Sequence, residues 1–356
     1  MSDDDFDEMD DISPVEKDEW SEDDEDDDED LLGNGETARS RKLKKDGVED
    51  ALGKAAPSWV IDLNQKHAIA RVSSRTVVMD FHPDRRVTYG NVGVDSDGKT
   101  VPITKKWMQH RKRREYPNGI VFAPNKDVPG AYNHWQGFSV QPFEGKSPDR
   151  GCRLFLKHLL EIACNGDEAL YRYHLGWLAH MIQKPEEKPG VAVVYKGRKR
   201  IGKDTVFEYV GRLFEHHYIT VANQDQMLGK FNAHQEKCLL LHMQEGFWAG
   251  SKAAEGMLKY LITSNQVMIE PKGMNAFPIP SVLRLFISSN EKWVIPATED
   301  EGRFFVLNVS EKRRNDHEYF GALRAEMDGE GPSALLASLQ GDDMATFQVR
   351  AVRAPP

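Results

Sequence analysis

The pattern of apolar and polar positions changes along the chain and divides it into segments. From residue 190 onward, short β-branched runs alternate with stretches whose apolar residues recur every three or four positions. Such alternation is typical of a parallel sheet whose strands are connected by helices. The pattern predicts strands at residues 191–195, 238–243, 282–287 and 304–309, and helices at residues 203–214, 252–262 and 316–327.

Two helices are predicted ahead of this region, within residues 149–189. Apolar residues at positions 154, 155, 159, 160 and 162 share one helical face, and the pair Asn165-Gly166 ends the first helix. Asp167 can cap a second helix, which runs to about residue 183 and stops before Pro185. We interpret the histidines of these helices as core or surface residues rather than metal ligands: His158, His174 and His180.

Residues 57–148 are predicted to form a small β-rich or α+β region. The stretch "ARVSSRTVVMDF" alternates like a strand, and "NVGVDSDGK" contains turn residues. A basic run, "KKWMQHRKRREY", surrounds Trp107 with lysines and arginines. Such a run is usually a solvated helix face, but the aromatic residue within it favours contact with nucleic acid. The candidate contacts are Arg111, Arg113 and Arg114.

The net charge of −10 conceals two parts of opposite sign. Residues 1–31 carry 19 of the 57 acidic side chains and one lysine, so the rest of the chain is net positive by 8. Such an acidic stretch has little apolar surface to bury, and residues 1–56 are therefore predicted to be a disordered tail and linker. The tail is either a solubilising segment or a DNA mimic that docks a basic partner.

Cysteine content and hydropathy indicate the compartment. The three cysteines show no metal-binding spacing, which is typical of small core residues in a reducing environment. No apolar stretch approaches 18 residues, and the N-terminus is acidic rather than a signal peptide. The sequence therefore predicts a soluble cytoplasmic protein, in the host cytoplasm if it is viral, with no membrane contact.

The stretch "VVYKGRKRIGKDT" is similar to a phosphate-binding loop. Gly197 and Gly202 are five residues apart, and Lys203 follows at once, between a predicted strand and a predicted helix. Backbone N–H groups of such a loop bind phosphate, and its lysine reaches the outer phosphates. Asp204 replaces the usual Ser or Thr. We interpret it either as a hydrogen-bond acceptor for groups that themselves bind the metal, or as a charge in the first turn of the helix. Thr205 then becomes the candidate magnesium ligand.

Three further residues follow in the order expected of an ATP-hydrolysing site. Glu245 ends a buried-looking strand, where an acid holds magnesium and polarises water, although it is otherwise an ordinary surface acid. Asn290 ends another strand and is a γ-phosphate sensor or a turn residue. Arg303 precedes a strand and is a candidate arginine finger. The pattern predicts ATP and Mg²⁺ as cofactors.

The ordered combination resembles the superfamily 3, AAA+-type helicases of phage and provirus primase–helicases, and more distantly the poxvirus primase–helicase. The resemblance covers residues 57–350 and is carried by "GRKRIGKDT", "KCLLLHMQEGFWAG", "VMIEPKGMNAFPI", "LRLFISSNEKWVIPA" and "EDEGRFFVLNVS". It implies a ring, commonly hexameric, with ATP at subunit interfaces. Arg303 would then act on the neighbouring subunit, and Lys272, in a hairpin that projects into the ring, would contact DNA.

These observations together predict an AAA+-like P-loop fold with a parallel sheet flanked by helices. Residues 190–312 would be the ATPase core, and residues 313–356 C-terminal helices and a tail. The predicted function is an ATP-dependent helicase on single-stranded or forked DNA in phage or mobile-element replication. No primase or polymerase domain is visible before Trp59, so the chain is predicted to be either a stand-alone helicase subunit, with a primase or polymerase acting in trans, or a piece of a larger system. Departures from the family at Arg200, Gln244 and Gly302 leave open a catalytically weak ATP-binding ring or loader, and a small-molecule kinase is the other alternative.

Overall fold

The computed structural model describes most of the chain beyond the predicted acidic tail. The described residues are 56–72, 75–80, 85–87, 94–96, 99–101, 103–222, 224–244, 252–272, 275–290 and 302–352. The predicted tail and Glu245 lie outside them. The chain divides into two units, residues 1–57 and 58–356, and the elements below belong to the second.

The first elements of this unit form a small sheet with helices. Its strand order is β3-β2-β1-β6, in which β1 pairs antiparallel with β2 and parallel with β6. The elements are α2 (Ser58–Lys66), β1 (His67–Val72), β2 (Arg75–Asp80), β3 (Arg85–Val87), β4 (Val94–Ser96), β5 (Lys99–Val101), α3 (Ile103–Gln109), β6 (Glu115–Tyr116), β7 (Ile120–Val121) and β8 (Tyr132–Asn133). Both helices and antiparallel strands are present, as the alternating pattern of residues 57–148 predicted.

Trp107 does not behave as the basic run suggested. Its side chain is 1% exposed, and its indole N–H donates to Asn64 Oδ1 at 2.9 Å. The same oxygen accepts from the backbone N–H of Arg114 at 2.6 Å. The ring is therefore a core residue that packs α3 against α2, so it no longer favours nucleic-acid contact over a solvated helix face for this basic run. The physical reason is that the apolar indole gains more from burial than from exposure between charged neighbours.

A helical layer follows, as predicted. It consists of α4 (Pro148–Gly151), α5 (Arg153–His158), a π-helical turn (Leu159–Ala163) and α6 (Glu168–Gln183). The face marked by Phe155, Leu159 and Ile162 is buried. Asp167 caps α6 by accepting from two backbone N–H groups, and α6 ends before Pro185. The prediction of two helices, their break and their cap is confirmed.

The main sheet has five parallel strands in the order β10-β11-β14-β9-β15. They are β9 (Ala192–Lys196), β10 (Tyr218–Val221), β11 (Leu240–Met243), β14 (Arg284–Ser289) and β15 (Phe304–Asn308). All residues of β11 and β14 are buried, which explains their continuous apolar runs. Four of the strands were predicted, while β10 was not.

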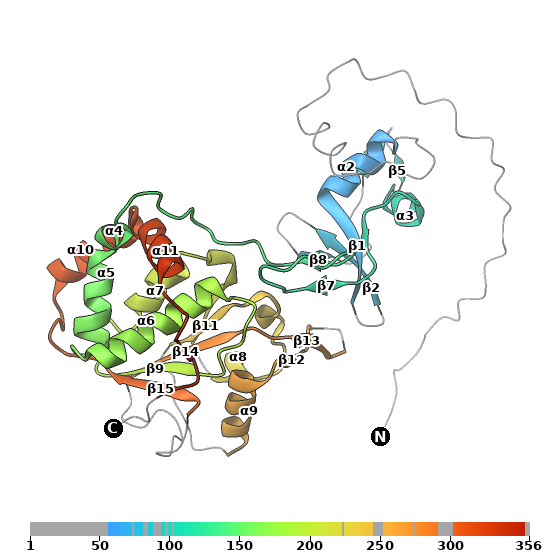
Figure 1. Ribbon diagram of the computed structural model, residues 1–356. Coiled ribbons are helices and arrows are strands. Elements are labelled where there is room, and N and C mark those ends of the chain that lie inside the picture. Colours follow the sequence, from blue (N-terminus) through green and yellow to red (C-terminus); the bar gives the residue numbers. More distant parts are fainter. Residues whose placement is uncertain are drawn as a thin grey trace, which may run out of the picture. The chain divides into compact units, whose positions relative to one another are not determined.

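Helices cover both faces of this sheet (Figure 1). Side chains of α5, α6, α7 (Thr205–Gly211), α10 (His317–Asp328) and α11 (Gly331–Gly341) pack on one face. The other face is covered by α8 (Gln224–Leu228), α9 (Lys252–Thr263) and the antiparallel hairpin of β12 (Gln266–Ile269) and β13 (Phe277–Pro280). The predicted parallel sheet flanked by helices is thus present, and so is the predicted hairpin.

Candidate functional site at the carboxyl edge of the main sheet

The candidate site lies where β9 and β14 end next to each other. Ser289 is in register with Lys196, and the backbone N–H of Gly197 donates to the carbonyl of Ser289 at 3.2 Å. The loop of residues 197–204 then leads from β9 into α7. The carboxyl ends of parallel strands are where ligands bind in open α/β sheets.

The backbone of this loop includes a tight, left-handed turn. Gly202 has φ +85°, and a Cβ placed there would lie 2.5 Å from Phe320 Cε1 and 2.9 Å from His158 Cε1. Only glycine avoids both the conformational cost and the collision. Arg200 has φ 65°, a region that non-glycine residues adopt at a cost.

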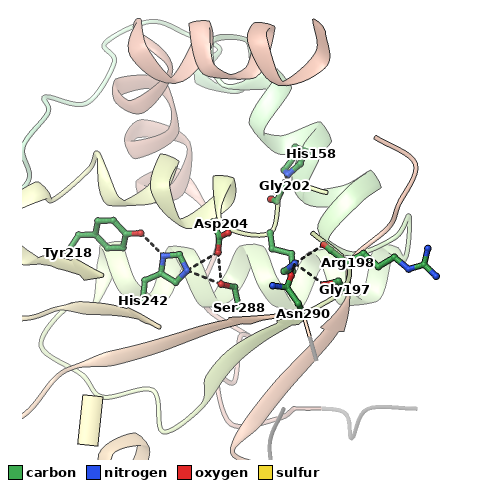
Figure 2. A network of polar contacts seen from close by, with 10 residues as sticks. His158, Gly197, Arg198, Gly202, Asp204, Tyr218, His242, Ser288 and Asn290 are labelled. Atoms are coloured by element: carbon green, nitrogen blue, oxygen red, sulfur yellow. Dashed lines mark hydrogen bonds and ion pairs between the residues drawn. The ribbon is translucent and has the colours of Figure 1, made fainter. Parts of the chain in front are cut away.

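The ammonium group of Lys203 forms hydrogen bonds with the loop that precedes it. Its Nζ donates to the carbonyls of Gly197 at 2.8 Å and Arg198 at 2.7 Å, and to Asn290 Oδ1 at 2.7 Å (Figure 2). The lysine is 6% exposed. An ammonium removed from water in this way needs all three of its hydrogens satisfied, and the loop carbonyls help to do this. The structure thus brings together Lys203 and Asn290, which lie 87 positions apart in the sequence.

Asp204 lies at the centre of a second set of hydrogen bonds. Its Oδ1 accepts from Ser288 Oγ at 2.5 Å and lies 3.2 Å from His242 Nε2. The other ring nitrogen of His242, Nδ1, lies 2.7 Å from the hydroxyl of Tyr218. Figure 2 shows Tyr218, His242 and Asp204 in succession, with Ser288 beside both His242 and Asp204. Ser288 Oγ also lies 3.4 Å from His242 Nε2. Burial alone would raise the pKa of Asp204, but hydrogen bonds from His242 and Ser288 and the charge of Lys203 hold it below the ordinary value.

His158 ties the loop to the helical layer. Its Nε2 lies 3.3 Å from the carbonyl of Gly202, and its Nδ1 lies 3.1 Å from the hydroxyl of Tyr319 on α10. Burial lowers the pKa of His158 to about 4, so the ring is neutral at physiological pH. This agrees with the interpretation of His158 as a core residue, and it explains how α10 supports the loop.

Two other predicted residues, Thr205 and Arg303, lie at different distances from the loop of residues 197–204. Thr205 is the first residue of α7, directly after Asp204. Arg303 precedes β15, and its carbonyl accepts from the backbone N–H of Ala192 at 2.8 Å. That contact lies at the amino ends of β9 and β15, whereas the loop lies at their carboxyl ends. At about 3.3 Å per residue, the strands separate Arg303 from the loop of the same chain by more than 10 Å.

The predicted DNA-contacting residues do not share this site. Lys272 is exposed and lies between β12 and β13. Arg111 and Arg114 are exposed, and Arg114 Nε donates to the hydroxyl of Tyr116 at 3.0 Å. Arg113 is half-buried and pairs with Glu115 at 2.8 Å. Their contact with DNA stays a prediction.

Two residues of the site were not predicted, Tyr218 and His242. Ser288 lies on the strand that was predicted to bring Asn290 to this edge of the sheet. A faint signal for His242 exists, because a histidine interrupts the apolar run "KCLLLHM" of a buried strand. Such a residue needs a polar partner when its strand is buried. The sequence contains no comparable signal for Tyr218, whose strand was not predicted.

Among the described residues, no group of three or more His, Cys, Asp or Glu side chains could hold a metal by itself.

Comparisons with known proteins find relatives from phage replication. A family model described as "Family of unknown function (DUF5906)" matches residues 195–314, which include the loop and most of the main sheet. The DNA primase-polymerase of Nitratiruptor phage NrS-1 is 26% identical over 179 residues. These make up 49% of this chain but only 24% of that relative. The chain is therefore homologous to part of a phage primase-polymerase.

Solved structures of the C-terminal region of the same NrS-1 protein share the fold. One matches with a TM-score of 0.63 at 17% identity, covering 83% of this chain and 72% of the solved one. A second, of residues 305–718, matches with a TM-score of 0.62 at 18% identity, covering 84% of this chain and 72% of the solved one.

Within the described residues, no helix is both long and apolar enough to cross a membrane.

Proposed function

We propose that this chain is an ATP-dependent DNA helicase motor that works in phage or mobile-element replication. The observation that carries the proposal is the loop of residues 197–204, closed around Lys203 and joined through it to Asn290. Lysine at a phosphate loop and a polar residue at the end of the adjacent strand are the groups that bind and sense a nucleotide's outer phosphates. Homology to a phage DNA primase-polymerase supports a role in DNA replication.

In this proposal, binding of ATP exchanges one set of contacts for another. Lys203 Nζ now donates to two loop carbonyls and to Asn290 Oδ1. Phosphate oxygens are stronger acceptors for an ammonium group than carbonyls, so Lys203 would turn toward the β- and γ-phosphates. Asn290 would then be free to orient the attacking water or to contact the γ-phosphate.

The residues present fit a magnesium ion. Mg²⁺ prefers oxygen ligands. It is usually held by one or two carboxylates together with substrate phosphates, and not by a full set of protein ligands. Asp204 and Thr205 offer a carboxylate and a hydroxyl at the end of the loop, and the predicted ligand Glu245 lies outside the described residues. When bound, the ion would neutralise charge that develops on the phosphates.

Arg303 supports a site completed by a second copy of the chain. Because it lies at the amino ends of the strands, it cannot reach the loop of its own chain. In a ring, the amino edge of one subunit can face the carboxyl edge of the next, which is a heterologous contact that closes on itself. We therefore propose a homo-hexamer in which Arg303 acts on the neighbour's ATP.

The proposed DNA contacts are electrostatic. Lys272, exposed between the strands of the β12–β13 hairpin, would touch the DNA backbone within the ring, and Arg111, Arg113 and Arg114 would add contacts to single-stranded or forked DNA. Phosphate contacts of this kind carry no sequence preference and weaken steeply with salt.

A second function is favoured by a specific observation. Arg200 takes up a left-handed backbone conformation, and Asp204 replaces the usual hydroxyl residue. Both departures fit a ring that binds ATP as a structural switch and hydrolyses it slowly. ATP binding with turnover near background would favour this alternative. A small-molecule kinase would show neither DNA stimulation nor dependence on Arg303.

The test is ATP turnover with and without single-stranded DNA, for the wild type, Lys203→Ala and Arg303→Ala. We expect DNA-stimulated turnover in the wild type and its loss in both variants. An equal mixture of the two variants should then recover roughly a quarter of wild-type turnover, because a quarter of randomly formed interfaces combine an intact lysine with an intact arginine. No recovery in the mixture would contradict a shared site. Turnover unchanged in Lys203→Ala would contradict the proposal as a whole.

The channel role of Lys272 is tested separately. Lys272→Ala should reduce DNA binding and DNA stimulation while leaving turnover without DNA unchanged. Lys157→Ala is the matched control, because Lys157 is an exposed lysine on α5 that forms an ion pair with Glu161 at 3.9 Å. Equal effects of the two substitutions would exclude a particular role for the hairpin.

A further inference from the structure

The carboxylate of Asp204 is held through one oxygen and open at the other. Oδ1 accepts from Ser288 Oγ at 2.5 Å and lies 3.2 Å from His242 Nε2. Within the described part of the chain, Oδ2 has no hydrogen-bond partner, and the side chain is 42% exposed. By contrast, His242 and Ser288 are buried. Two buried groups thus fix the direction of a carboxylate whose second oxygen remains available to a ligand.

His242 orients the carboxylate and is itself held from its other side. A carboxylate oxygen only accepts, so His242 Nε2 carries the hydrogen that it donates to Asp204 Oδ1. Its second ring nitrogen, Nδ1, lies 2.7 Å from the hydroxyl of Tyr218. This contact holds the imidazole in the orientation in which Nε2 points at the carboxylate.

This arrangement exchanges the usual places of two metal-binding groups. In nucleotide sites built on such a loop, the residue after the lysine supplies a hydroxyl to Mg²⁺, and a neighbouring strand supplies a carboxylate. Here the residue after Lys203 is the carboxylate, and the neighbouring strand β14 supplies the hydroxyl of Ser288. A carboxylate that binds a metal is in turn oriented by hydrogen bonds from outside the metal's ligand set.

We propose that Asp204, and not Thr205, is the loop's direct ligand to the nucleotide-bound Mg²⁺, with Ser288, His242 and Tyr218 as positioning residues. This inference rests on the proposed nucleotide site. Successive residues of a helix point about 100° apart, so Thr205 does not share the direction of Asp204. Asp204 is also the one of the two whose side chain is held in place, by Ser288 and His242.

The experiment is calorimetric titration of the full-length protein with ADP, once with Mg²⁺ and once with EDTA. The ratio of the two affinities measures the contribution of the metal for wild type, Asp204→Asn and Thr205→Val. Asp204→Asn is expected to lose at least tenfold of the metal-dependent affinity and to bind ADP in EDTA as well as the wild type does. Thr205→Val, which removes only the hydroxyl, should keep the metal-dependent affinity within about twofold.

Retention of the full metal effect in Asp204→Asn, or its loss in Thr205→Val, would overturn the inference. If the wild type binds ADP in neither condition, the proposed nucleotide site itself fails, and the two failures are thereby distinguished. Should Asp204→Asn not fold, Asp204→Ala decides, because it removes the ligand atoms from this position: a reduced metal effect supports the inference and an undiminished one overturns it.

The positioning role has its own readout. Tyr218→Phe removes only the hydroxyl that holds His242, so it should lower the Mg²⁺-dependent affinity several-fold and leave ADP binding in EDTA unchanged. A purely structural role would lower the melting temperature and leave the ratio of the two affinities at its wild-type value. That second result would remove Tyr218 and His242 from the metal site.

Discussion

Glu326 joins three helices through one carboxylate, and its loss should be costly. From α10, Oε2 accepts from the backbone N–H of Leu154 at 2.8 Å, and Oε1 accepts from that of Phe155 at 2.9 Å. Oε1 also accepts from the hydroxyl of Tyr209 on α7 at 3.1 Å. The first two are N–H groups of the first turn of α5, which have no partner within the helix.

The magnitude follows from what Glu326→Ala leaves behind. Three donors lose their acceptor, and Phe155 and Tyr209 are both about fully buried. An unsatisfied buried donor costs about 1–3 kcal/mol, although water can reach part of the space left by a half-buried glutamate. We therefore expect the free energy of unfolding to fall by about 3–5 kcal/mol. Burial, together with the Glu326 charge, raises the pKa of Tyr209, so its hydroxyl remains a donor at neutral pH.

The assay is urea unfolding followed by circular dichroism and tryptophan fluorescence, with the change read from the transition midpoint at unchanged slope. Glu318→Ala is the control, because Glu318 is an exposed glutamate on the same helix and should cost less than about 1 kcal/mol. If Glu326→Ala falls within about 1 kcal/mol of wild type, the carboxylate does not hold these helices together and the reasoning is refuted.

Three further predictions concern the loop, a buried lysine and the thiols. Arg200→Gly should raise the free energy of unfolding by about 1 kcal/mol, because it relieves a φ of 65°. Gly202→Ala should lower the free energy of unfolding. Melting temperatures that shift in the same direction for both variants would contradict this account of the loop. Burial lowers the pKa of Lys188 to about 7, so from about pH 7 to 10 the unfolded chain holds a proton that the folded chain has lost. Stability of the wild type should therefore rise with pH relative to Lys188→Met, and parallel curves would refute it. Because all three cysteines are buried and the pKa of Cys152 is raised to about 12, thiols should resist alkylation at pH 8 until the protein is denatured, and rapid labelling of the native protein would be the contrary result.

The strands that the sequence predicted correctly are those buried on both faces. Runs such as "VAVVY" and "RLFIS" admit few alternatives, because a parallel strand between two layers of helices is apolar at nearly every position. Strand β10, "YITV", is an edge strand with three of four residues only partly buried, so its apolar signal is weak. Helix α7 is shorter than predicted, because Lys203 and Asp204 belong to the loop rather than to the helix.

The site was predictable in part for a similar reason. Lys203 and Asn290 follow strands directly, and residues at the ends of adjacent parallel strands meet at one edge. The row of Tyr218, His242 and Asp204 depends on β10 lying beside β11, with Thr220 in register with His242. Strand order is decided by long-range packing, which the periodicity of one segment does not encode.

The order of strands in the main sheet also determines when the protein can fold during synthesis. Strand β9 is the first of the five along the chain, yet its two neighbours, β14 and β15, are the last two. Val193 pairs with Phe286 on one side and Phe305 on the other. Until those residues leave the ribosome, an apolar strand remains without partners at both edges, a state prone to aggregation.

The loop of residues 197–204 is therefore attached to the strand whose pairing is completed last. A nascent chain can order this loop only near the end of translation of the main sheet, and slow, non-local pairing of this kind exposes the chain to chaperones in the meantime. Fragments that end before β14 should accumulate in the insoluble fraction, however complete their loop sequence is. Any boundary chosen for expressing the main sheet and its helices alone must for that reason extend beyond β15.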